Sequence, residues 1–162
     1  MTSLSKSSLD MKQTTLCYIE RDEKYLMLHR VKKVNDENRD KWIGIGGRIE
    51  AGETPFDCVR REVKEETGLD LVTPRYRGIV TFVSNVFGTE YMHLFTDKDT
   101  SGEPSDCDEG ELCWINKSDM CRLNLWAGDM IFLKLLDSDE RFFSLKLVYE
   151  GDSLVSHTLE FA

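Results

Sequence analysis

The sequence predicts an α+β fold in which helices lie on both faces of a mixed β-sheet. Three observations support this class: short apolar runs separated by turn residues, a capped helical segment near the middle of the chain, and a second helical pattern near the end. A chain of 162 residues is long enough to bury a core without disulfides or structural metal. We therefore expect one domain over residues 13–162, preceded by a flexible tail over residues 1–12, which is rich in Ser and lacks periodicity.

Apolar runs bounded by turn residues predict the strands of the sheet. In chain order these strands are expected at residues 14–20, 25–30, 42–47, 77–83, 90–96, 112–115, 141–149 and 153–161. The charged residues 21–24 and the turn residues 150–152 each predict a hairpin. The polar segments 31–41 and 97–109 are expected to be loops.

The best-defined helix is expected to run from Pro55 to about Thr67. Thr54 can accept a hydrogen bond from an amide of the first turn, and the fixed φ of Pro55 suits the first helical position. Gly68 can end the helix in the left-handed conformation without steric cost. Phe56, Val59 and Val63 recur at steps of three and four, so they form the stripe that packs on the core. The second helix is expected over residues 127–136.

Three acidic residues of the first helix, Glu62, Glu65 and Glu66, share a second face beside this apolar stripe. Two carboxylates about 4 Å apart repel by roughly 4 kcal/mol at an effective dielectric near 20. A converged cluster therefore needs cations, and hard oxygen ligands suit Mg²⁺ or Mn²⁺; the alternative is a solvated acidic face. Arg61 is placed to pair with Glu65 or with Glu53, which would leave Glu62 and Glu66 less compensated.

The composition excludes several classes of protein. A formal net charge of −9 argues against binding a nucleic-acid polymer, and is explained either by solubility or by a metal that bridges protein and anionic substrate. The five cysteines form no C-x-x-C pair, which makes a zinc site or a disulfide framework unexpected. We expect a cytoplasmic protein without a membrane partner, because the sequence has neither a secretory signal nor a long apolar run.

The segment from Gly47 to Leu69 resembles the Nudix box. That pattern specifies a glycine, a glutamate six residues later, and then R-E-apolar-x-E-E-x-G-apolar. The chain fills each of these places, with Gly47, Glu53, Arg61, Glu62, Val63, Glu65, Glu66, Gly68 and Leu69. The resemblance implies an α/β/α sandwich and metal-dependent hydrolysis of a nucleoside diphosphate linked to a further group, with Mg²⁺ as cofactor and Mn²⁺ as a substitute.

The resemblance also assigns roles to individual residues. It implies that the carbonyl of Gly46 and the carboxylates of Glu62, Glu65, Glu66 and Glu109 bind metal, with Glu111 as the competing choice for Glu109. Glu62 or Glu65 would also accept the proton of the attacking water. Arg61 and Glu53 would hold the loop of the box against the helix. Arg30 would contact substrate phosphates; its alternative is a surface charge at the end of a strand.

Beyond the box, the chain from Trp114 through the second helix is similar to MutT-type oxidised-purine triphosphatases. In that group a tryptophan and acidic residues at the start of this helix recognise the base, and these positions correspond to Trp126 and Asp129. Gly128 and Ile43 depart from the group, where a second acid and a base-reading asparagine stand. The resemblance favours a substrate such as 8-oxo-dGTP, cleaved to a nucleoside monophosphate and pyrophosphate. Another nucleoside diphosphate derivative and a non-catalytic nucleotide sensor are the alternatives, and the oligomeric state stays open.

Overall fold

The computed structural model describes residues 11–32, 36–106 and 108–162. In chain order its elements are β1 (Met11–Arg21), β2 (Lys24–His29), β3 (Trp42–Ile43), α2 (Pro55–Thr67), β4 (Arg75–Ser84), β5 (Gly88–Asp97), β6 (Glu111–Asn116), the 3₁₀ helix η1 (Lys117–Arg122), α3 (Asp129–Ser138), β7 (Phe143–Glu150) and β8 (Ser153–Phe161). Within the described ranges, no helix is both long and apolar enough to cross a membrane.

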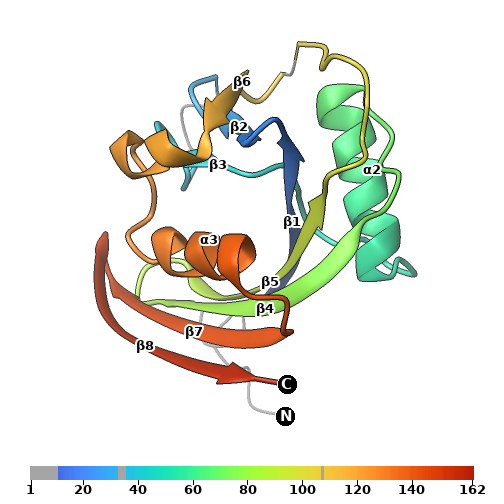
Figure 1. The fold of residues 1–162 in the computed structure, drawn as a ribbon. Helices are drawn as coiled ribbons and strands as arrows, with labels where there is room; N and C mark the ends of the chain where they lie inside the picture. Colours follow the sequence, from blue (N-terminus) through green and yellow to red (C-terminus); the bar gives the residue numbers. More distant parts are fainter. Residues whose placement is uncertain (1–10, 33–35, 107) are drawn as a thin grey trace.

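The strands form one mixed sheet in the order β3-β2-β1-β5-β4-β7-β8, and β6 pairs with β2. The β1–β5 and β4–β7 pairs are parallel, whereas the other pairs are antiparallel. Figure 1 shows that β5, β4, β7 and β8 curve beneath α3, whereas α2 lies on the other side of β1. The predicted mixed sheet with helices on both faces is therefore confirmed.

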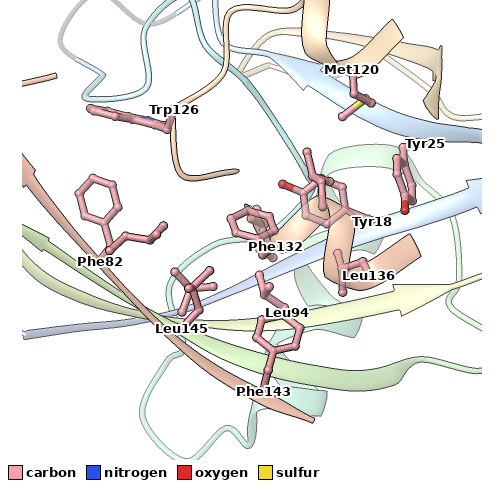
Figure 2. Close-up of a cluster of buried hydrophobic side chains, with 14 of the residues drawn as sticks. Tyr18, Tyr25, Phe82, Leu94, Met120, Trp126, Phe132, Leu136, Phe143 and Leu145 are labelled. Carbon is pink, nitrogen blue, oxygen red and sulfur yellow. The ribbon is translucent and has the colours of Figure 1, made fainter. Parts of the chain in front are cut away.

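Strand β1 separates two hydrophobic cores, because successive side chains of a strand point to opposite faces. Tyr18 belongs to the core beneath α3, where its ring lies 5.9 Å from that of Phe132 (Figure 2). The next residue, Ile19, belongs to the core that contains Val59 and Val63 of α2. All five of these side chains are at least 99% buried. The two helices are thus anchored to opposite faces of the same central strand.

The predicted boundaries of α2 are confirmed. The Thr54 hydroxyl accepts from the Asp57 amide at 3.0 Å, and the Asp57 carboxylate accepts from the Thr54 amide at 3.0 Å, which forms a capping box. Gly68 ends the helix at φ 77°, in the left-handed region. The predicted apolar stripe is only partly buried, because Phe56 stays 36% exposed at the edge of the core while its ring packs edge-on against Phe95.

Other boundaries differ from the prediction. The strand expected over residues 42–47 ends at Ile43, and the chain then runs beside β1 with isolated bridges at Ile45 and Arg48. Met11 and Lys12, expected in the tail, belong to β1; the remainder of the predicted tail lies outside the described residues. The 3₁₀ helix η1 had no counterpart in the prediction, since it is too short for a periodic pattern.

Candidate active site

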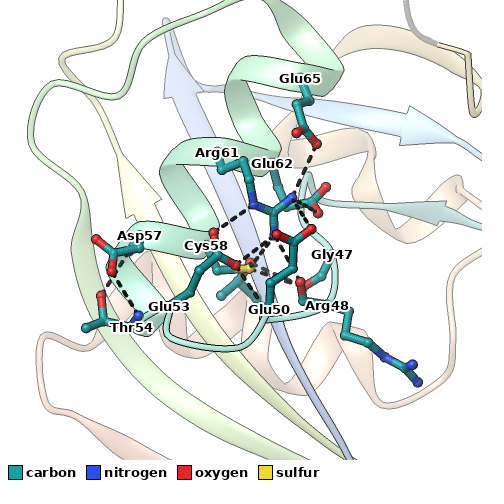
Figure 3. A network of polar contacts seen from close by, with 11 residues as sticks. Gly47, Arg48, Glu50, Glu53, Thr54, Asp57, Cys58, Arg61, Glu62 and Glu65 are labelled. Atoms are coloured by element: carbon teal, nitrogen blue, oxygen red, sulfur yellow. Dashed lines mark hydrogen bonds and ion pairs between the residues drawn. The ribbon is translucent and has the colours of Figure 1, made fainter.

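Arg61 is the centre of a polar network that ties the loop of the box to α2 (Figure 3). Its guanidinium donates to both oxygens of Glu53, at 2.7 and 2.9 Å, and to the carbonyl of Arg48 at 3.1 Å. The bonds from Arg61, together with one from the Glu50 amide, lower the pKa of Glu53 to about 2. Arg61 therefore connects Glu53 and the Arg48 carbonyl of the loop to the helix.

The same guanidinium also contacts two of the three acids on this face of α2, and this corrects the prediction for Glu62. Arg61 Nη1 lies 2.7 Å from Glu62 Oε1 and 3.3 Å from Glu65 Oε2, so Glu62 is compensated rather than left without a cation. Burial raises the pKa of Glu62, although Arg61 acts in the opposite direction. The long arginine side chain reaches its immediate neighbour in sequence, a contact that helical spacing does not predict.

The glycines of the box bring its backbone close to both β1 and Glu62. The carbonyls of Ile45 and Gly47 accept from amides of β1, so the intervening carbonyl of Gly46 points away from that strand. A Cβ on Gly46 would lie 1.8 Å from the carbonyl oxygen of Thr15. A Cβ on Gly47 would lie 2.4 Å from the carboxyl carbon of Glu62. Glycine at 47 is thus what lets the Glu62 carboxylate rest against the loop.

A cavity of about 330 Å³ opens beside this network. It brings together most of the residues singled out from the sequence, namely Arg30, Ile43, Gly46, Glu62, Glu109, Trp126 and Asp129. Four predicted site residues do not line it: Glu53, Arg61, Glu65 and Glu66. Glu65 is 60% exposed on its side chain, whereas Glu66 is buried with 6% exposure, so the three helix glutamates occupy different environments.

Arg30 and Glu109 meet in the wall of this cavity. Arg30 Nη1 donates to Glu109 Oε2 at 2.9 Å, and Arg30 Nε donates to Asp36 Oδ2 at 2.5 Å. Burial lowers the pKa of Arg30, but its bond to Asp36 and the charges of Glu109 and Glu66 outweigh that effect and raise it. Glu111, the alternative to Glu109, begins β6 and does not line the cavity.

Trp126 and Asp129 lie where α3 begins. Trp126 is 6% exposed, packs edge-on against Phe82 and donates from Nε1 to Asn38 Oδ1 at 2.9 Å. It therefore belongs to the core and to the cavity wall at once. Asp129 is 5% exposed, and burial raises its pKa to about 8, with Lys41 opposing this effect. No hydrogen bond reaches its carboxyl from the part of the chain that the structure describes.

Several side chains of the cavity wall were missed by sequence reasoning: Asn38, Phe82, Phe87, Glu90 and Met92. For Phe82, Glu90 and Met92 the sequence does contain a signal, because alternation along a strand shows which residues of that strand share a face of the sheet. Which face carries the cavity depends on where α3 packs, and that is not a local property of either strand. Asn38 gave no signal, since it lies in a polar loop.

The donor chemistry of the site suits a hard divalent cation, because the carboxylates and the Gly46 carbonyl offer oxygen ligands. Among residues 11–32, 36–106 and 108–162, no three acidic, His or Cys side chains are gathered as a formed metal site. Glu62 and Glu65 contact Arg61, and Glu109 contacts Arg30. A shared cation would therefore have to replace arginine contacts. The four described cysteines are free thiols, and one of them, Cys58, contacts the Gly47 carbonyl beside this donor set.

The sandwich, the box helix and the adjoining cavity define the class of proteins built on a Nudix domain. A family model described as the NUDIX domain matches residues 11–136, and the chain belongs to this family. The family comprises hydrolases of phosphoric anhydrides that act on small nucleotide substrates and generally use divalent metals.

Individual relatives refine this placement. The chain is 32% identical over 125 residues to YvcI, an uncharacterized Nudix hydrolase of Bacillus subtilis, across 74% of this chain and 75% of the relative. It is 32% identical over 122 residues to an oxidized purine nucleoside triphosphate hydrolase of Danio rerio, across 74% and 78% of the two chains. The crystal structure of a MutT protein from Bacillus halodurans superposes with a TM-score of 0.82 and 26% identity, covering 92% of this chain and 97% of the other.

Proposed function

We propose that this Nudix hydrolase cleaves nucleoside triphosphates to a nucleoside monophosphate and pyrophosphate, with an oxidised purine such as 8-oxo-dGTP as its preferred substrate. One observation carries the proposal. A single cavity joins Gly46 and the box residue Glu62 to the buried Trp126 and Asp129. In a nucleotide bound there, the phosphates would lie beside the acidic metal ligands, and the base would lie against Trp126 and Asp129.

The residues proposed to hold Mg²⁺, with Mn²⁺ as a substitute, are Glu62, Glu65, Glu66, Glu109 and the carbonyl of Gly46. When bound, the metal would supply neutralisation of phosphate charge and a more acidic water molecule. The fit of the donor set supports this assignment, as does Gly47, which leaves room for the Glu62 carboxylate against the loop.

Side chains of the protein would bind the phosphates, accept the proton and position the site. Arg30 faces the cavity and would contact the phosphate oxygens once it leaves Glu109. Burial raises the pKa of Glu62, and a carboxylate with a raised pKa is a stronger base toward the proton of the attacking water. Arg61 and Glu53 would keep the loop and helix in register, so that these groups face the substrate.

The ring of Trp126 and the carboxyl of Asp129 would contact the base. A buried carboxyl without a hydrogen-bonding partner is costly, and the edge of a purine would satisfy it. The names of the relatives from Danio rerio and Mus musculus, both oxidized purine nucleoside triphosphate hydrolases, support the same class of substrate.

A nucleotide screen tests the activity. With Mg²⁺ present, the protein should release pyrophosphate from nucleoside triphosphates, most rapidly from 8-oxo-dGTP, and release little inorganic phosphate. Glu62→Gln and Glu65→Gln should each lower kcat by at least about a hundredfold, because the amide keeps the shape but loses the charge. Near-normal kcat in both variants at saturating Mg²⁺ would contradict the catalytic assignment. Cleavage of nucleotide sugars or dinucleotides alone would support a different nucleoside diphosphate derivative as substrate.

A second measurement tests the base assignment. Asp129→Ala should lower kcat/KM for 8-oxo-dGTP by about tenfold or more, since an unpaired polar edge costs roughly 1–3 kcal/mol. Hydrolysis of dGTP should fall less. Because Ile43 lines the cavity where related enzymes read the base with asparagine, a broader preference among purine triphosphates is the competing outcome. Equal loss for every nucleotide would mean that Asp129 does not read the base.

A further inference from the structure

We propose that Glu90 on β5 is a second base-reading carboxyl, which accepts a hydrogen bond from the ring N–H that oxidation creates on a guanine base. This inference rests on the proposed function and names the group that separates oxidised from unmodified guanine. Asp129 at the start of α3 and Glu90 on β5 would then bind different parts of one planar ring.

The sheet directs Glu90 into the cavity. In the parallel β1–β5 pair, Glu90 is the partner of Lys12, and Met92 is the partner of Thr14. Side chains two residues apart on a strand share a face, so Lys12, Thr14, Glu90 and Met92 lie on one side of the sheet. All four line the cavity together with Asp129. The position of Glu90 is therefore set by strands rather than by a loop.

One oxygen of Glu90 is held and the other is available to a ligand. Thr14 Oγ1 donates to Glu90 Oε2 at 2.8 Å. Within the described ranges, no side chain or amide donates to Oε1. The Thr14 contact fixes the direction of the carboxyl group without using its capacity to accept a second hydrogen bond.

The surroundings of Glu90 disfavour its ionised form in the absence of a further hydrogen-bond donor. Burial raises the pKa of Glu90, and Glu37 adds to this effect, whereas the Thr14 hydroxyl, Lys12 and Arg48 lower it. Asp129 is close enough for Glu90 to contribute to its raised pKa. A ligand N–H that reaches Glu90 would favour the ionised form in the same way as the Thr14 hydroxyl.

The chemistry of the ring explains why an acceptor belongs here. Unmodified guanine presents N7 as a hydrogen-bond acceptor, whereas oxidation at C8 converts N7 into an N–H donor. A carboxylate can only accept, so it binds the oxidised ring and opposes the lone pair of the unmodified one. Apolar side chains of Phe82, Phe87 and Met92 complete the wall beside Glu90, where a flat ring can be desolvated.

The test compares Glu90→Gln with a matched control. The amide keeps the shape of the side chain but gains a donor, which can pair with N7 of unmodified guanine. Relative to the wild type, Glu90→Gln should lower kcat/KM for 8-oxo-dGTP by about tenfold or more and leave that for dGTP unchanged or higher. Glu160→Gln, which removes the same charge on the exposed strand β8, should alter neither value.

Binding of the products separates this inference from the proposed function. Dissociation constants for 8-oxo-dGMP and dGMP, measured by titration calorimetry without metal, require no hydrolysis. The wild type should prefer 8-oxo-dGMP, and Glu90→Gln should reduce that preference by about tenfold. Thr14→Val, which removes the hydroxyl that orients Glu90, should reduce it by a smaller factor in a fully folded protein.

The outcomes are distinct. An unchanged preference in Glu90→Gln, or a wild type that binds both products equally, overturns the role of Glu90 even if triphosphates are cleaved. Equal losses for both nucleotides overturn it as well. A wild type that cleaves no triphosphate contradicts the proposed function, while a reduced product preference in Glu90→Gln would still support Glu90 as the base reader.

Discussion

Arg30 and Glu109 are bound to each other, with Arg30 Nη1 2.9 Å from Glu109 Oε2. The sequence assigned these two residues to different tasks, one at the substrate phosphates and one at the metal. Their side chains are 13% and 28% exposed, so the pair lies partly out of water in the wall of the cavity. If both assignments hold, substrate binding breaks this ion pair: Arg30 then contacts a phosphate and Glu109 then contacts the metal. Before binding, each of the two residues compensates the charge of the other.

The first prediction tests which loop acid is the metal ligand. Glu109→Gln should weaken the apparent affinity for Mg²⁺ by at least about tenfold. Removing a residue that only hydrogen-bonds to a metal ligand already costs about tenfold or more, and removing a ligand should cost at least as much. Glu111→Gln should leave it within about twofold, because Glu111 does not face the cavity. Initial rates measured across Mg²⁺ concentrations decide between them, and the reverse ranking would assign the role to Glu111.

The second prediction concerns the contact between Gly47 and Glu62. Gly47→Ala would place a methyl carbon 2.4 Å from the Glu62 carboxyl carbon, so the carboxylate must move. We expect kcat to fall by about tenfold or more, since displacing a reacting group by about 1 Å can cost a hundredfold. The melting temperature should change little, because the end of a flexible side chain can give way.

Gly151→Ala provides the control for this substitution. Gly151 lies in the β7–β8 turn at φ 58°, with no atom within 4 Å of an added Cβ. Alanine there should cost about 1–2 kcal/mol of stability through backbone strain and leave kcat unchanged. If Gly47→Ala lost stability and kept its kcat, the close contact with Glu62 would be structural.

The features predicted correctly from the sequence are those with local causes. The ends of α2 follow from Thr54, Pro55 and Gly68, which act within one turn of the helix. The first and last hairpins follow from their turn residues and from strand alternation. Together with the complete box, these signals were sufficient to predict the mixed sheet with helices on both faces.

The features that were missed depend on contacts distant in sequence or on side-chain length. Arg30 and Glu109 are 79 residues apart, so no periodic pattern connects them. The bond from Arg61 to Glu62 joins neighbours whose positions on a helix point about 100° apart, and it forms because arginine is long. The place of Glu90 in the cavity required knowing which face of β5 lies beneath α3.

The third prediction is that divalent metal stabilises the folded protein. A cation that binds the carboxylates of the native state at ten times its dissociation constant adds about 1.4 kcal/mol, which corresponds to roughly 3–6 °C in a domain of this size. Mg²⁺ should therefore raise the melting temperature, and chelation should lower it again. The Glu62→Gln, Glu65→Gln double variant should lack this shift, with sodium chloride of equal ionic strength as the control. Equal shifts in the double variant and the wild type would mean that the metal binds elsewhere.

The fourth prediction follows from the burial of Asp129, which raises its pKa to about 8 from an ordinary value of 3.8. Between these two values the folded protein keeps the proton that the unfolded chain has released, so this group makes the protein less stable as pH rises. Lys41 opposes the shift and Glu90 adds to it, and both are retained in Asp129→Asn.

Because asparagine does not titrate, Asp129→Asn should lack this contribution. One pKa unit corresponds to about 1.4 kcal/mol, so the unfolding free energy of the variant minus that of the wild type should rise by at least about 1.4 kcal/mol between pH 4.5 and pH 7.5. Urea unfolding of both proteins at several pH values provides the measurement, and the difference between them cancels other titrating groups. A constant difference across this range would mean that Asp129 ionises in the folded protein as it does in water, which would contradict the effect of burial on its pKa.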